Sequence, residues 1–590
     1  MRFRDCSAVI LAFVCHVALS QKPVHPGSAA VPLRTIYATE DAWRKAQRGA
    51  ADEDHPEKIV AELPRADVTT QEAQLKHWQG VLRQLDGVKV AGLSADERVN
   101  FEVFRAQIVV LVNAQKFREY ERPANSDSTF WSDEEEVTRQ PFKTPEDYRN
   151  YVQQLKDIPR YFAENVDEMR AGLARGFTPP KVTLVGRDAS LTPMAEAKSA
   201  ESTIYFKPLE KMPASISPAE QKKLRDEAAA TIMNELVPAY TSLLKFWRDE
   251  YVPHAQDSLA AEALPDGKAY YQSKILEFTT LTLTPDEIHA IGLKEMAGIH
   301  AEMIAAMKAS GFKGDLPAFL KFLRSDPQFY AKTPEELLMR SAWVAKEFDG
   351  VAGQYFGYLP RERFGIKPVA PEIAPFYTSA RGGPGEYLVN TYDLPSRGLY
   401  SMPALTLHES APGHAFQMPI AEEVIKARKL PKFRNVYISA YGEGWALYCE
   451  RLGTEMGIYH TPYETFGMLS YQAWRAARLV VDTGVHAQGW TREQAQQYLR
   501  DNTALSDHEI ETEVDRYISW PGQALSYYLG EMAIEKARHK AEAALGSKFN
   551  VRAFHDAVLE LGSVPLPVLE EHIDAFIAKG GVGPYPEMEQ

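Results

Sequence analysis

One stretch decides the fold and chemistry expected of this chain: Leu405-Thr406-Leu407-His408-Glu409-Ser410-Ala411-Pro412-Gly413-His414-Ala415-Phe416-Gln417. It contains a His-Glu pair and a second histidine six positions after the first. Six residues turn an ideal α-helix through about 600°, which would place His408 and His414 on different faces. Pro412 cannot donate a backbone hydrogen bond, and Gly413 tolerates unusual torsions. A break or bulge there would bring the two histidines together, whereas a regular helix would argue against a shared site.

The residue types in this stretch suit a zinc site. Neutral imidazole nitrogens bind zinc well, and a catalytic zinc site uses three protein ligands and a water molecule. The usual zinc peptidase motif, HExxH, places a glutamate directly after its first histidine, where it acts as general base. We therefore predict that His408 and His414 bind one Zn²⁺ per chain and that Glu409 is the base. The alternative is a capped helix with two structural histidines.

A third ligand is expected from a later segment, Ala440-Tyr441-Gly442-Glu443-Gly444-Trp445-Ala446-Leu447-Tyr448-Cys449-Glu450. Glycines on both sides of Glu443 allow its backbone to come close to another element. Glu450 lies on nearly the same helical face, and two carboxylates are costly to bury there unless they are paired or metal-bound. We predict that Glu443 is the third ligand and that Glu450 orients a histidine. The reverse assignment stays open.

Helix signals dominate the rest of the chain. Several segments open with Ser or Thr, then Pro, then an acid three residues after the cap, which is typical of a helix N-terminus; they begin at Thr144, Ser217, Thr284 and Thr333. We predict a mainly α protein, a large helical two-lobed fold with a deep cleft and a small β element beside the metal helix. We expect one domain over residues 21–590, with the metal-site core at about 270–530.

The N-terminus has the pattern of a secretory signal peptide. Arg2 and Arg4 give a basic start, an apolar run follows, and Ala18-Leu19-Ser20 offers a small-x-small cleavage site. We predict that residues 1–20 are a signal peptide and that the protein is periplasmic or secreted; the alternative is a buried N-terminal helix. No later stretch is long and apolar enough to predict stable membrane insertion after signal removal.

Two of these segments carry a family resemblance. HESAPGHAFQ and GEGWALYCE resemble the signatures of a bacterial family known as domain of unknown function 885, and further matching segments lie at about residues 270–530. That family is similar to the helical gluzincin zinc metallopeptidases, such as angiotensin-converting enzyme, thimet oligopeptidase and carboxypeptidase Taq. The resemblance implies that His408, His414 and Glu443 bind zinc and that Glu409 is the base. The chain departs from these peptidases by two extra residues between the histidines.

A zinc peptidase also needs a donor for the oxyanion that forms during hydrolysis. The candidates are His486, Tyr517 and Tyr527, because the related peptidases place a histidine or tyrosine late in the chain for this role; the alternative is that they belong to the core. Arg478 or Arg516 is a candidate for holding a substrate carboxylate, since the guanidinium fork matches it. Both arginines are equally compatible with ordinary ion pairs.

Together these features predict an exported zinc-dependent hydrolase, most simply a peptidase, that acts on a peptide or a small amide. A short β-like run, Tyr387–Tyr392, precedes the metal segment, and its edge is expected to hold an extended peptide. The alternatives are a zinc hydrolase of a non-peptide amide or ester, and a non-catalytic binding protein. The formal net charge of −14 makes nucleic acid a poor partner. The sequence makes no prediction of oligomeric state.

Overall fold

The structure, a computed structural model, describes residues 30–50, 55, 57–126, 128–371 and 374–585. The fold of this part is mainly α, as predicted, with helices α1–α24 and one small β-sheet. The predicted signal peptide at residues 1–20 lies outside the described residues. Among the described helices, none combines the length and the apolar character that crossing a membrane requires.

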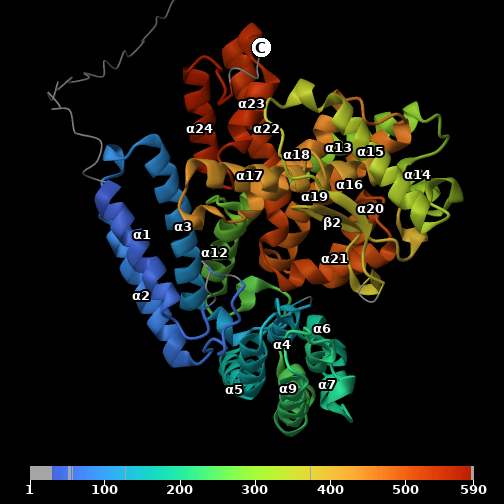
Figure 1. Ribbon diagram of the computed structural model, residues 1–590. Coiled ribbons are helices and arrows are strands. Elements are labelled where there is room, and N and C mark those ends of the chain that lie inside the picture. Colours follow the sequence, from blue (N-terminus) through green and yellow to red (C-terminus); the bar gives the residue numbers. More distant parts are fainter. Residues whose placement is uncertain (1–29, 51–54, 56, 127, 372–373, 586–590) are drawn as a thin grey trace, which may run out of the picture.

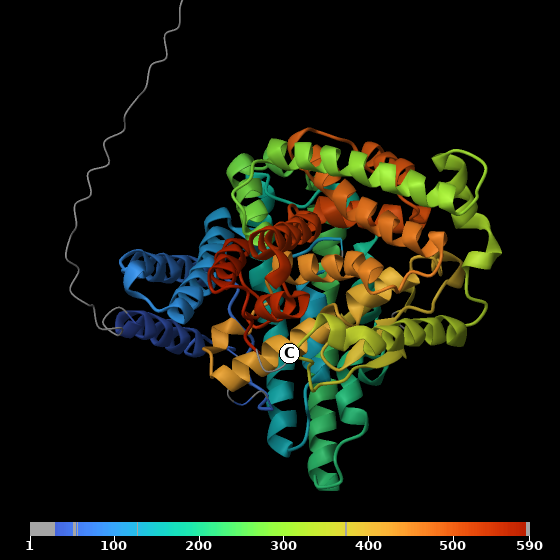
Figure 2. The same cartoon turned by 90° about the horizontal axis from the view of Figure 1, so that it is seen from above.

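Two helical groups formed by the first half of the chain flank the body of the molecule (Figures 1 and 2). One group packs Leu33, Trp78 and Phe104 into a small core and consists of α1 (Ala30–Lys45), α2 (Val68–Asp86) and α3 (Ala95–Phe117). The other has its own aromatic core and consists of α4 (Phe130–Glu134), α5 (Pro145–Arg175), α6 (Lys181–Leu184), α7 (Thr192–Ala195), α8 (Lys207–Glu210), α9 (Pro218–Thr231), α10 (Val237–Phe246) and α11 (Val252–His254).

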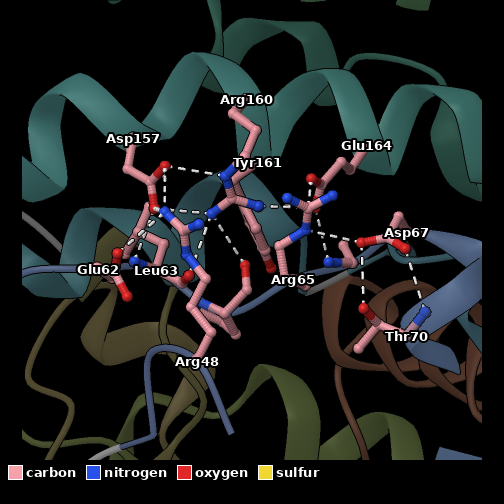
Figure 3. A network of polar contacts seen from close by, with 12 residues as sticks. Arg48, Glu62, Leu63, Arg65, Asp67, Thr70, Asp157, Arg160, Tyr161 and Glu164 are labelled. Atoms are coloured by element: carbon pink, nitrogen blue, oxygen red, sulfur yellow. Dashed lines mark hydrogen bonds and ion pairs between the residues drawn. The ribbon is translucent and has the colours of Figure 1, made fainter. Parts of the chain in front are cut away.

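A polar network ties the segment before α2 to helix α5 (Figure 3). Its centre is Arg160, which donates to Asp157 at 2.7 and 2.9 Å and to Glu164 at 2.7 Å. The same guanidinium donates to the carbonyl oxygens of Leu63 and Pro64. The segment is therefore fixed to α5 by charge-assisted hydrogen bonds as well as by packing.

The body of the molecule is built around two long helix pairs, because α13 packs along α19 and α18 packs along α22. Two further hydrophobic clusters fill this body. Its helices are α12 (Gly267–Thr279), α13 (Pro285–Ala309), α14 (Leu316–Ser325), α15 (Pro334–Tyr355), α16 (Met402–Glu409), α17 (His414–Arg428), α18 (Ser439–Glu455), α19 (Pro462–Ala487), α20 (Arg492–Asn502), α21 (Asp507–Ser519), α22 (Ser526–Leu545), α23 (Val551–Leu559) and α24 (Leu566–Ala578). Helices α16 to α19 meet in the middle of the molecule (Figure 1).

The helix starts predicted from Ser/Thr-Pro-x-acid patterns are confirmed. The side chains of Thr144, Ser217, Thr284 and Thr333 each accept a hydrogen bond from a backbone N–H in the first turn of α5, α9, α13 and α15. These signals are local, so they survive whatever tertiary contacts the helices make.

The small sheet lies beside α16 and contains β1 (Gly365–Pro368), β2 (Ala380–Gly383) and β3 (Glu386–Val389) in the order β1-β3-β2. Strand β3 pairs in parallel with β1 and antiparallel with β2. The β-like run before the metal segment is thus real, but it ends at Val389. The expectation that it offers a free edge to a peptide is wrong, because both of its edges are paired. The strand at the edge beside α16 is β2.

Candidate metal centre

A sharp break between α16 and α17 answers the spacing problem posed by the two histidines. Helix α16 ends at Glu409 and α17 begins at His414. The N–H of Gly413 donates to the Leu407 carbonyl at 3.0 Å, and a Cβ at Gly413 would lie only 1.8 Å from the backbone oxygen of His408. The backbone turns back on itself at a position that only glycine fits. The two imidazole rings end 5.0 Å apart, centroid to centroid.

Glu443, near the start of α18, completes a group of three ligand atoms. Its Oε2 lies 3.4 Å from Nε2 of His408 and 3.4 Å from Nε2 of His414. All three atoms lie within 4.8 Å of one another. A tetrahedral zinc site with bonds of about 2.05 Å has ligand atoms about 3.3 Å apart. The donor types and their separations therefore fit a zinc-like cation.

Glu450 lies behind this group, two turns along α18, and is fully buried. Its Oε1 is 2.7 Å from Nδ1 of His408, the ring nitrogen opposite the one that faces Glu443. The guanidinium of Arg475, on α19, lies 3.6 Å from the same oxygen. This geometry favours the first of the two predicted assignments, in which Glu443 is the ligand and Glu450 orients His408.

The electrostatics of the group favour a bound cation. Burial alone would lower the pKa of His408, but hydrogen bonds to Glu443 and Glu450 outweigh it and raise the pKa to about 10. Burial would raise the pKa of Glu443, but the imidazoles of His414 and His408 hold that pKa well below its usual range. Glu409 adds a further negative charge nearby. Carboxylates thus outnumber permanent cations here, so a divalent ion would be stabilised.

The position of Glu409 is set by strand β2. The N–H of Gly382 donates to Glu409 Oε2 at 2.7 Å. A Cβ at Gly382 would lie 1.6 Å from the backbone oxygen of Glu409, so the strand can approach the end of α16 this closely only at a glycine. Such contact fixes the carboxylate at the last residue of the helix.

Tyr527 is the predicted oxyanion donor that the structure places beside the group. Gly444 of α18 and Gly530 of α22 touch through their backbones, since a Cβ on Gly444 would lie 2.4 Å from Gly530. This close crossing brings the Tyr527 ring to 6.4 Å from the His408 ring, nearly parallel to it. The guanidinium of Arg478 lies 4.3 Å from the Tyr527 ring.

The other predicted donors point into the core. The backbone N–H of Ala261 donates to His486 Nδ1, and His486 Nε2 contacts the Tyr517 carbonyl at 2.9 Å, so both ring nitrogens are occupied. Burial lowers the pKa of His486 to about 4, which keeps it neutral. The Tyr517 hydroxyl accepts from Trp474 and from Arg478. These arrangements argue against an oxyanion role for His486 and Tyr517 and favour the core alternative.

The two predicted carboxylate-binding arginines also differ. Arg478 is buried, donates to Glu513 at 2.9 Å and supports Tyr517 and Tyr527, so its place is structural. Arg516 is 32% exposed and lies 3.9 Å from Glu513, a long contact. The phenol of Tyr527 and then the carboxylate of Glu513 raise the pKa of Arg516, which places it beside the donor candidate.

Sequence reasoning missed Tyr437, Gly382 and Arg475. The Tyr437 hydroxyl donates to Glu443 Oε1 at 2.7 Å, and burial of that hydroxyl and the Glu443 charge raise its pKa well above the usual range. Tyr437 precedes α18 in a loop with no periodic pattern. Gly382 belongs to a glycine-rich run, Gly382-Gly383-Pro384-Gly385, which is typical of a turn. Of these three residues, only Gly382 lies in a local sequence pattern that sets it apart.

Comparisons with known proteins identify a family. The model of a family described as bacterial proteins of unknown function (DUF885) matches residues 46–573. A search of curated proteins found no match.

Solved structures show a similar fold. One from Colwellia psychrerythraea, described as a "putative lipoprotein", has a TM-score of 0.82 and 26% identity over 93% of this chain and 98% of that one. A second, from Shewanella oneidensis, is described as a "putative lipoprotein of unknown function". It has a TM-score of 0.65 and 15% identity over 92% of this chain and 98% of that one. An M32 carboxypeptidase from Deinococcus radiodurans R1, at a TM-score of 0.29 and 12% identity over 87% and 99%, is too dissimilar to support an argument. Because the family model matches most of its length, the chain belongs to the bacterial family DUF885.

Proposed function

We propose that this protein is an exported zinc-dependent hydrolase, a peptidase in which His408, His414 and Glu443 bind one Zn²⁺ and Glu409 is the general base. The observation that carries the proposal is the convergence of two imidazole nitrogens and one carboxylate oxygen, with separations of 3.4 Å to the carboxylate. That spacing matches the edge of a zinc tetrahedron, about 3.3 Å. An accidental surface cluster would not place two buried histidines around one carboxylate oxygen.

Bound zinc would supply a Lewis acid that lowers the pKa of a coordinated water to about 7. The protein residues around it then have distinct tasks. Gly382 holds Glu409 through Oε2, which leaves Oε1 to accept a proton from the attacking water and to pass it to the leaving amine. The oxygen of that water forms the new bond to the carbonyl carbon, and the C–N bond breaks.

Substrate would be held by the groups on the other side of the site. Tyr527 is the candidate donor to the developing oxyanion, because it stacks beside His408 and is backed by Arg478. Arg516, partly exposed beside Tyr527, is the candidate partner for a substrate carboxylate. This pairing favours a peptide or small amide with a nearby carboxylate over a neutral ester.

Export is part of the same proposal. The sequence pattern of residues 1–20 is that of a signal peptide. Two solved structures of similar fold are described as "putative lipoproteins", a class of exported proteins. We therefore place the enzyme in the periplasm or outside the cell.

The first test is the metal content of the purified protein, measured by plasma mass spectrometry without added metal. We expect about one zinc per chain in the wild type and none in His408→Ala. His460→Ala is the control, because His460 is an exposed histidine paired with Glu347, and it should keep its zinc. Absence of zinc from the wild type, with no uptake at micromolar zinc, would refute the proposal.

The second test separates catalysis from binding. Glu409→Gln should retain zinc and lose about 10²–10⁴-fold in turnover, the usual contribution of a general base. A peptide library set against an ester panel would then identify the scissile bond. Zinc binding without hydrolysis of any amide or ester would favour a binding protein.

A further inference from the structure

Tyr437 stands out as a residue directly beside the metal group that the proposed mechanism does not use. It lies outside the helices, between the short turn Lys432–Arg434 and α18. The residue is 43% exposed, yet its hydroxyl donates to Glu443 Oε1 at 2.7 Å. Its ring is 6.3 Å from the ring of His414. Tyr437 therefore covers the outer side of the group.

The first turn of α18 is shaped to admit this ring. A Cβ at Gly442 would lie 2.4 and 2.6 Å from two ring carbons of Tyr437 and 2.7 Å from its hydroxyl oxygen, far inside van der Waals contact. Any side chain at position 442 would push the ring away from Glu443. The glycine before the proposed ligand thus serves the contact between Tyr437 and that ligand.

The consequence is that the two oxygens of Glu443 have different partners. Oε2 faces Nε2 of both histidines at 3.4 Å, whereas Oε1 accepts from the Tyr437 phenol. A carboxylate with one oxygen held by a phenol presents only the other oxygen to a cation. A free carboxylate could turn and present both.

We propose that Tyr437 is a positioning residue that forces Glu443 to bind the cation through one oxygen, so that a position stays open for water or substrate. This inference rests on the proposed function, because catalytic zinc sites keep three protein ligands and an open position. Partners of this kind tune metal affinity and geometry although they do not touch the metal.

The test uses Tyr437→Phe in the full-length mature protein, which removes one oxygen atom and keeps the ring. We expect zinc affinity, measured by competition with a chromophoric chelator, to fall about 10-fold. In the Co²⁺-substituted protein we expect the visible absorption bands to weaken, as they do when coordination rises above four. Neither measurement depends on turnover.

Tyr441→Phe is the matched control. Its hydroxyl donates to the Val558 carbonyl at 2.7 Å, a bond of the same length from the same region of the chain, but away from the metal group. It should keep the wild-type zinc affinity and cobalt spectrum. Gly442→Ala provides a second route, because its Cβ displaces the Tyr437 ring and hydroxyl from Glu443 while residue 437 stays a tyrosine, and it should reproduce the cobalt spectrum of Tyr437→Phe.

The outcomes are distinct. If the wild type binds zinc but both Tyr437→Phe and Gly442→Ala keep its cobalt spectrum, the role of Tyr437 is overturned and the proposed function stands. The same holds if Tyr441→Phe changes the spectrum equally, since the effect would then be a general loss of packing. Failure of the wild type to bind metal would overturn both proposals.

Discussion

The network around Arg160 and the group around His408 both gather charged side chains, but their carboxylates have different partners. Around Arg160, three arginines face four acids, and the carboxylates of Asp157 and Glu164 are bonded to guanidinium and backbone N–H groups. Around His408, three glutamates face two imidazoles, with Arg475 3.6 Å from Glu450. Nδ1 of His414 and Oε2 of Glu450 are buried without a hydrogen-bond partner.

This difference is the one expected between a network that stabilises the fold and a site that binds a cation, as proposed for the His408 group. Arg160 donates to side chains and to backbone carbonyls, so its charge is neutralised inside the protein. Burying unsatisfied carboxylates and imidazoles costs free energy of folding unless a further partner compensates. At the His408 group, a divalent cation would be the partner of Nε2 of both histidines and Oε2 of Glu443, the atoms that face one another.

Arg160→Met should have the largest effect on folding. It leaves the carboxylates of Asp157 and Glu164 largely buried without their main partner, and such losses cost about 3 kcal/mol. Urea denaturation of the metal-free protein should show this loss, with zinc affinity unchanged. Arg170→Met is the control, because its pair with Glu250 is 48% and 43% exposed and contributes only about 0–1 kcal/mol. Equal losses in the two variants would mean that the network is not specifically stabilising.

Glu450→Gln tests the other side of the comparison. It removes the charge that faces His408 Nδ1, and zinc affinity should fall by about 10–100-fold. Glu531→Gln is the matched control, since Glu531 is a buried carboxylate on α22 that accepts from Gln472 and whose pKa burial raises well above the usual range. An equal loss of zinc affinity in the control would show that Glu450 acts only through the core.

The sequence predicted the parts of this site that depend on local chemistry. Pro412 and Gly413 signalled a possible break, and the glycines beside Glu443 signalled a close backbone approach. Both features were found, because a torsion or a missing Cβ constrains the backbone wherever the segment packs. The capped helix starts were predictable for the same reason.

What the sequence could not predict depends on contacts between distant segments. Tyr437 looks like any loop tyrosine until α18 brings Glu443 under it. His486 and Tyr517 have suitable side chains, but only the packing of α19 against α21 and the short turn Ala261–Ala263 shows that their polar atoms are occupied. Strand β3 has no free edge, because β1, which carried no recognisable strand signal, pairs with it on one side and β2 on the other.

Two buried aspartates extend the comparison to pH. Burial raises the pKa of Asp482 to about 7, although it accepts from Tyr271 and Gly522, so its contribution to stability is fully present below about pH 4 and is lost as pH rises toward 7. Burial would also raise the pKa of Asp157, but hydrogen bonds from Arg160 and the Leu63 N–H lower it. The contribution of Asp157 to stability is therefore lost only as pH falls below about 4.

Asp482→Asn should therefore remove a slope in the pH dependence of stability. Between pH 5 and 6 the free energy of unfolding of the wild type should fall by about 1.4 kcal/mol relative to this variant. Asp157→Asn, the control from the Arg160 network, should run parallel to the wild type in that interval. Urea denaturation at four or more pH values gives both curves, and a parallel Asp482→Asn curve would contradict the assignment.

The smallest effects should come from helix caps, and they should be equal in the two regions. Thr144 caps α5, which carries the Arg160 network, and Thr461 caps α19, which carries Arg475; both form reciprocal capping boxes. Each Thr→Ala change should cost about 1 kcal/mol, measured by urea denaturation, with zinc affinity unchanged. Caps satisfy backbone N–H groups at solvent-exposed helix ends, so their effect does not depend on what the helix carries further along. A much larger loss of zinc affinity in Thr461→Ala would show that the metal group depends on the helix as a whole. Equal small losses of unfolding free energy in the two variants would mean that the two regions differ in the partners of their charged side chains and not in their helix ends.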